Sequence, residues 1–165
     1  MQHIFAPWRF AYVSHAEPTD RCIFCAAADG GEAELTVLRG ERAFVLLNRY
    51  PYTSGHAMVA PVAHVGEIGD LDGTVLAEVM RLAQRVVTAL RGIYSPHGFN
   101  VGMNLGEAAG AGIADHLHLH IVPRWRGDTS FMTVSGGVRV IPEDLGATYR
   151  KLQTALEAHG VEQGQ

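Results

Sequence analysis

The clearest pattern along the chain is a run of apolar residues spaced three and four apart between Asp70 and Gly92. This spacing places them on one face of a helix, and mostly charged or amide side chains occupy the opposite face. Gly92 stands where the pattern stops, as glycine often does at a helix end. The pattern therefore predicts a helix over Asp70–Gly92. Its apolar face consists of Val75, Leu76, Val79, Leu82, Val86, Val87 and Leu90.

Four shorter apolar runs have the length of strands. Ala43–Asn48 and His56–Val62 flank a segment rich in turn residues, so we expect them to form an antiparallel pair. Phe99–Leu105 and His116–Val122 predict two more strands, joined by a loop of small residues.

A second amphipathic helix is predicted over Pro142–Ala158. The order of strands, long helix, strands and helix favours an α+β fold. We expect a mainly antiparallel sheet of about five strands, with the helices on one side. We also expect a single domain over residues 1–165, with its core at 22–126 and a helical extension at 142–158.

Length and charge exclude some classes of protein. A chain of 165 residues can bury a core without disulfides, and its 13 basic and 17 acidic residues give a net charge of −4. This balance disfavours a basic surface for nucleic acid. No apolar stretch is long enough for a signal peptide or a membrane span. We therefore expect a soluble, cytoplasmic protein that binds neither nucleic acid nor membrane.

Histidine is the unusual residue type, with nine in the chain. His116, His118 and His120 alternate with apolar residues, so on a strand they share one face at intervals of roughly 6.6 Å. Two such rings can act on one phosphorus atom. The alternatives are an exposed polar strand face and a metal site. Of the acidic residues, only Asp115 lies close enough, and its position places it on the opposite face.

The loop before these histidines contains three glycines, Gly106, Gly110 and Gly112, and follows Asn104. Small residues let backbone N–H groups approach an anion closely. A glycine-rich connection is often only a loop. Its place directly before a row of histidines indicates an element that holds phosphate beside one that attacks it.

Cys22 and Cys25 have the spacing of metal ligands or of a redox pair. They could equally be two small buried apolar residues. A structural zinc site needs two further ligands, for which His64 and His116 are candidates. The other five histidines show no pattern that separates them from ordinary ones: His3, His15, His56, His97 and His159.

These residues carry a resemblance to the histidine-triad superfamily of nucleotide hydrolases and transferases. The family signature alternates three histidines with apolar residues, and His116–Val122 fits it at every position. The segment from Asn48 to Pro61 looks like the family's ribose-side hairpin, and Asn104–Gly106 looks like its phosphate loop. Residues 6–12, the cysteine pair, and residues 97–102 and 123–128 are similar to the bacterial branch that includes diadenosine tetraphosphate phosphorylases.

The resemblance implies roles for individual residues. His118 would be the nucleophile, His120 would contact the phosphate or bridging oxygens, and His116 would support the strand end or bind metal. In branches with zinc, residues matching Cys22, Cys25, His64 and His116 are its ligands, and no organic cofactor is implied. A homodimer formed through strands and the long helix is also implied. The chain departs from the family pattern before the triad, where Ala111 and Gly112 replace polar residues that contact phosphate.

Three functions are compatible with these residues. The first is nucleotidyl transfer from a dinucleoside polyphosphate such as diadenosine tetraphosphate, through a nucleotidyl-His118 intermediate released by phosphate or water. The second keeps this nucleophile but acts on an adenosine phosphoramidate or an acyl-adenylate. The third is a nucleotide-binding regulatory module without turnover.

Overall fold

The computed structural model describes residues 21–30, 35–129 and 141–161. These residues form an antiparallel five-stranded sheet in the order β1-β2-β3-β5-β4. The strands are β1 (Thr36–Arg39), β2 (Ala43–Leu47), β3 (Ala57–Pro61), β4 (Gly98–Met103) and β5 (Leu119–Arg124). The helices are α2 (Ile23–Ala28), α3 (Gly73–Tyr94) and α5 (Leu145–Val161), with 3-10 turns at η2 (Ile68–Asp70) and η3 (Glu107–Ala109). The predicted α+β class is confirmed.

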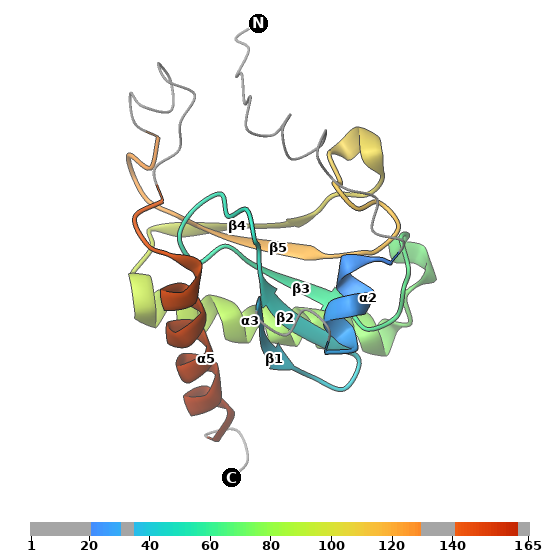
Figure 1. The fold of residues 1–165 in the computed structure, drawn as a ribbon, viewed down its shortest axis with the longest axis horizontal. Coiled ribbons are helices and arrows are strands. Elements are labelled where there is room, and N and C mark those ends of the chain that lie inside the picture. Colours follow the sequence, from blue (N-terminus) through green and yellow to red (C-terminus); the bar gives the residue numbers. More distant parts are fainter. Residues whose placement is uncertain (1–20, 31–34, 130–140, 162–165) are drawn as a thin grey trace, which may run out of the picture.

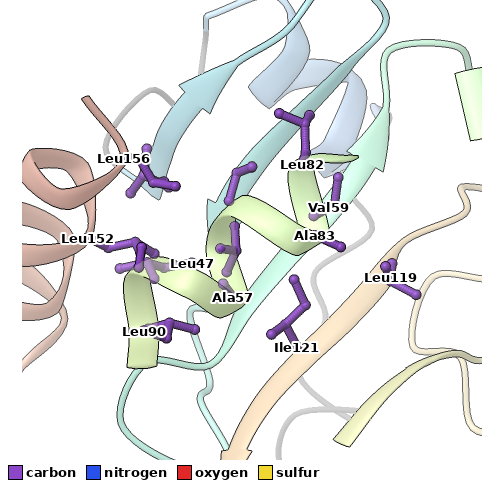
Figure 2. Close-up of a cluster of buried hydrophobic side chains, with 14 of the residues drawn as sticks. Leu47, Ala57, Val59, Leu82, Ala83, Leu90, Leu119, Ile121, Leu152 and Leu156 are labelled. Carbon is purple, nitrogen blue, oxygen red and sulfur yellow. The ribbon is translucent and has the colours of Figure 1, made fainter. Parts of the chain in front are cut away.

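Helices cover both faces of the sheet (Figure 1). Successive side chains of a strand point to opposite faces, and every residue of β2 and β3 is buried, so both faces carry apolar side chains that a helix can cover. On one face, α3 crosses β2, β3 and β5, and α5 packs beside it. Figure 2 shows this core, with Leu47, Val59 and Ile121 from the strands. On the other face, Phe24 of α2 packs against Phe44 and neighbouring strand residues. The two predicted helices, which match α3 and α5, lie on one side of the sheet as expected, and α2, which was not predicted, covers the other side.

The long helix begins and ends later than predicted. Asp72 caps its N-terminus, where the carboxylate accepts a hydrogen bond from the backbone N–H of Thr74 at 2.7 Å. At the other end, Gly92 lies inside the helix. Ser95 terminates it in a left-handed conformation, with its N–H bonded to the carbonyl of Arg91.

The predicted strand hairpin is confirmed, with Leu47 opposite Ala57 and Ala43 opposite Pro61. The strand predicted from His116 instead begins at Leu119. His116 and His118 therefore precede β5, and of the three predicted histidines β5 contains His120. The N–H of Leu117 still bonds to the carbonyl of Val65, so the approach to the strand is anchored.

None of the described helices is both long and apolar enough to cross a membrane. The irregular N-terminal segment, including the motif at residues 6–12, lies outside the described residues, as do His3 and His15.

Candidate active site

Of the three alternating histidines, His120 lies in the middle of the sheet, on the face that carries α2, and His116 and His118 lie in the segment that leads into β5. His120 pairs with Met58 of β3 on one side and with Gly102 of β4 on the other. The His118 and His120 rings meet edge to face, with their centroids 4.8 Å apart. His116 and His118 are buried and His120 is partly exposed, so the pair opens toward solvent at His120.

His118 has one ring nitrogen committed to the backbone. Its Nδ1 lies 2.9 Å from the carbonyl oxygen of His116, and a carbonyl only accepts hydrogen bonds. Nδ1 must therefore carry the proton, which leaves the lone pair on Nε2. Burial lowers the pKa of His118, so the ring is neutral near pH 7. A neutral imidazole with a free Nε2 can attack an electrophile.

His120 is oriented by His56, a histidine that no pattern in the sequence separates from ordinary ones. His56 is buried just before β3, and its Nε2 lies 3.0 Å from Nδ1 of His120. The backbone N–H of Tyr52 donates to Nδ1 of His56 at 3.1 Å, so the His56 proton is on Nε2 and is donated to His120. This leaves His120 with its proton on Nε2, where it can be donated to a substrate oxygen.

In the sequence, His56 shows only that it follows Gly55 at the start of a predicted strand. The pairing of β3 with β5 is what places His56 beside the triad. Burial, together with the neighbouring His118, lowers the pKa of His120 to about 4. His120, like His118, is therefore neutral at pH 7.

Asn48, predicted to bind substrate, lies directly after β2. Its Oδ1 accepts a hydrogen bond from the N–H of Tyr50 at 2.9 Å, and its Nδ2 lies 3.4 Å from Nδ1 of His56. The structure thus brings Asn48 to the histidine site through His56. Its contact with a substrate stays a prediction.

The small-residue loop connects β4 to the segment before β5. Gly106 and Gly110 both have positive φ angles, which favour glycine, and they bracket the η3 turn. Asn104 donates to the carbonyl of Gly110 at 3.4 Å, so its side chain helps to close the loop. Gly112 is exposed in the bend that follows. Phosphate contacts from these four residues stay predictions.

The four residues predicted as metal ligands come together. One ligand atom from each of Cys22, Cys25, His64 and His116 can be chosen so that all four lie within 4.8 Å of one another. Nδ1 of His116 lies 3.5 Å from the sulfur of Cys22 and 3.3 Å from Nδ1 of His64. Two thiolates and two imidazoles are a common tetrahedral zinc set, so the residues fit the metal.

The tautomer of His116 suits this role. Its Nε2 lies 2.9 Å from the carbonyl of Pro61 and must donate to it, which leaves the lone pair on Nδ1, facing the cysteines. Desolvation and the neighbouring Cys22 raise the pKa of the Cys25 thiol. A bound metal would therefore displace a thiol proton.

Comparison with known proteins identifies the family that the resemblance in the sequence indicated. A family model described as the HIT domain matches residues 32–127. The AP-4-A phosphorylase of Mycobacterium tuberculosis is 40% identical over 164 residues, which cover 93% of this chain and 84% of the relative.

Solved structures share the fold. A zinc-bound histidine triad family protein from Mycobacterium smegmatis aligns with a TM-score of 0.72 and 31% identity, covering 87% of this chain and 98% of that one. The diadenosine triphosphate hydrolase of Plasmodium falciparum aligns with a TM-score of 0.60 over 79% of this chain and 80% of its own; at 14% identity, this shows a common fold.

Proposed function

The chain belongs to the HIT domain family, and from this premise we propose that it is an enzyme that transfers a nucleotidyl group from a dinucleoside polyphosphate, such as diadenosine tetraphosphate, through His118. The observation that carries the proposal is the orientation of this ring. Nδ1 of His118 is held by the carbonyl of His116, and Nε2 is left as the nucleophile.

The first displacement forms a bond between Nε2 of His118 and the α-phosphorus. The bond from that phosphorus to the bridging oxygen breaks, and the nucleoside polyphosphate leaves with the electron pair. The positive charge that develops on the His118 ring is stabilised by its Nδ1–H bond to the backbone carbonyl. The proton on Nε2 of His120 is available to the phosphate oxygens, where negative charge builds up.

In the second displacement, water or inorganic phosphate attacks the phosphorus, and the bond to His118 breaks. Water releases adenosine monophosphate, whereas phosphate releases adenosine diphosphate. The M. tuberculosis relative is named a phosphorylase, which favours phosphate as the acceptor.

Product analysis tests this proposal. Diadenosine tetraphosphate is supplied with and without phosphate, and adenosine diphosphate is expected only with phosphate. His118→Ala should abolish turnover and retain nucleotide binding, and an active variant would refute the proposal. Turnover of an adenosine phosphoramidate alone would favour the second reaction class, and nucleotide binding without any trapped adduct would favour a regulatory module.

We also propose zinc as the ion held by Cys22, Cys25, His64 and His116, consistent with the zinc-bound M. smegmatis neighbour. Bound to these four residues, the ion would supply a fixed link between α2 and the segment before β5. The reaction above uses the chain's own histidines.

We further propose a homodimer through the edge strand β4 and helix α3. β4 is at the end of the sheet, Val101 on it is 47% exposed, and Met80 on α3 is exposed to the same extent. Light scattering should give twice the mass of the chain. The single domain over 1–165 and the cytoplasmic location stay predictions.

A further inference from the structure

Phe24 lies between the two cysteines and touches the proposed nucleophile. Its ring stacks on that of His118, with centroids 4.7 Å apart and planes inclined by 28°. The Phe24 ring also lies beside the ring of His116, with the two centroids 5.1 Å apart. Phe24 is only 1% exposed, so it acts from behind the site rather than on a substrate.

The hydrogen bond to His118 does not by itself fix the plane of the ring. The terminal torsion of a histidine is broad, and one bond at Nδ1 leaves the ring able to rock about that contact. A flat aromatic face stacked on the ring restricts this motion. The lone pair on Nε2 lies in the ring plane, so holding the plane aims the lone pair at the phosphorus.

Both restraints on His118 originate at the cysteine–histidine cluster. The carbonyl that holds Nδ1 belongs to His116, and the stacked ring belongs to the helical turn between Cys22 and Cys25. Ile113, at the end of the glycine-rich loop, packs against the same apolar cluster as Phe24. One buried aromatic side chain thus contacts both the proposed ligand His116 and the proposed nucleophile His118, and the loop packs against the cluster to which it belongs.

We propose that Phe24 is a positioning residue for His118, and that the metal cluster aims the nucleophile through Phe24 and the carbonyl of His116. This inference rests on the proposed function and deepens it. The cluster then has two roles: it holds the fold together and it sets the geometry of the reacting nitrogen.

The first test compares two leucine variants. Phe24→Leu removes the flat face, and Phe44→Leu is its control, because Phe44 is equally buried in the same cluster and stacks on none of the described histidine rings. Both should lower the unfolding midpoint similarly and keep the metal, as measured by elemental analysis. Phe24→Leu should lower kcat about tenfold with KM changed less than about twofold, because misaimed groups lose rate. Phe44→Leu should keep kcat.

The second test is a double-mutant cycle with Cys22→Ser, which should lose the metal and lower kcat. If both residues act through His118, the double variant loses little more kcat than Cys22→Ser alone. Multiplicative losses, or equal kcat for the two leucine variants, would overturn the inference while leaving the proposed function intact. A wild-type chain without turnover on any nucleotide would overturn both.

Discussion

Backbone groups determine which nitrogen carries the proton in three of the site histidines, His56, His116 and His118. The carbonyl of Pro61 accepts a hydrogen bond from His116, the carbonyl of His116 accepts one from His118, and the N–H of Tyr52 donates one to His56. Backbone groups do not titrate, so each ring keeps the same tautomer wherever it is neutral. Similar side chains thereby suit three different proposed roles: His116 as a metal ligand, His118 as the nucleophile and His56 as a hydrogen-bond relay.

Replacing His56 tests this relay. In His56→Ala, His120 loses the partner that keeps its proton on Nε2, so kcat should fall about tenfold or more, as when a preorganised donor is lost. The control is His97→Ala, since His97 is exposed and its Nδ1 accepts from the backbone N–H of Arg126. Steady-state kinetics on both variants provide the measurement. A His56 variant with wild-type kcat would contradict the relay.

Acid should destabilise the protein through His120. Its pKa is about 4 in the folded chain because of burial, against about 6.5 for an unfolded histidine. Between these pH values the unfolded chain binds a proton that the folded chain excludes, so stability is complete above the window and falls as the pH is lowered through it. Chemical unfolding at several pH values should show that the free energy of unfolding falls more steeply with decreasing pH for wild type than for His120→Gln. Parallel curves would count against this assignment.

The candidate site was predictable, because alternation marks the three histidines and spacing marks the two cysteines. The roles of His118 as nucleophile and of the cysteines as metal ligands come from the family resemblance and stay predictions. His56 was not predictable, since its partner lies 64 residues away and only strand pairing joins them. Phe24 was also missed, because a buried aromatic beside two cysteines has no local pattern that separates packing from positioning.

At the scale of elements, the turn before β3 is held against the end of α3. A Cβ on Gly55 would lie 2.9 Å from Leu90 and 3.1 Å from Tyr94, and the φ angle of Gly55 is +79°. This close packing brings α3 up to the turn that carries His56. The position of the histidine therefore depends on a helix on the other face of the sheet.

Two glycine-to-alanine variants separate this contact from a general glycine effect. Gly55→Ala should cost about 1–3 kcal/mol of unfolding free energy, through its strained φ angle and the contact with Leu90. Gly92→Ala lies within α3 with open space around it and should stabilise by about 0.5–1 kcal/mol. Denaturant unfolding measures both. Changes of the same sign in the two variants would exclude this explanation.

Elements with a clear apolar pattern were predicted well, among them α3 and the hairpin of β2 and β3, whereas β1 and α2 were not predicted. α3 was found from its apolar spacing, but the boundary residues Asp72 and Ser95 act through capping, which the apolar pattern does not encode. β1 and α2 have four and six residues, too few to show a period. β1 is held by its pairing with β2, and α2 by the packing of Phe24 on the sheet.

At the scale of the whole molecule, the cysteine–histidine cluster joins segments far apart in the chain. Cys22 approaches His116 across 94 positions, and Cys25 lies 3.2 Å from His64 across 39. A metal bound here links α2 to both segments and stabilises the folded state against the unfolded one.

Metal removal should therefore lower thermal stability. With a chelator, the unfolding midpoint should fall by about 5 °C or more, and added zinc should restore it. The Cys22→Ser variant should bind less than one equivalent of zinc, and the chelator should change its unfolding midpoint little. Calorimetry with elemental analysis measures this, and metal-free wild-type protein of unchanged stability would refute a structural ion.

The same 94-residue separation sets an order of events during biosynthesis. Cys22 and Cys25 leave the ribosome well before His116, and at about 5–20 residues per second the interval is roughly 5–20 s. Throughout it the two thiols lack the partner that completes their cluster. The proposed metal would therefore gain its full set of ligands only after His116 has emerged.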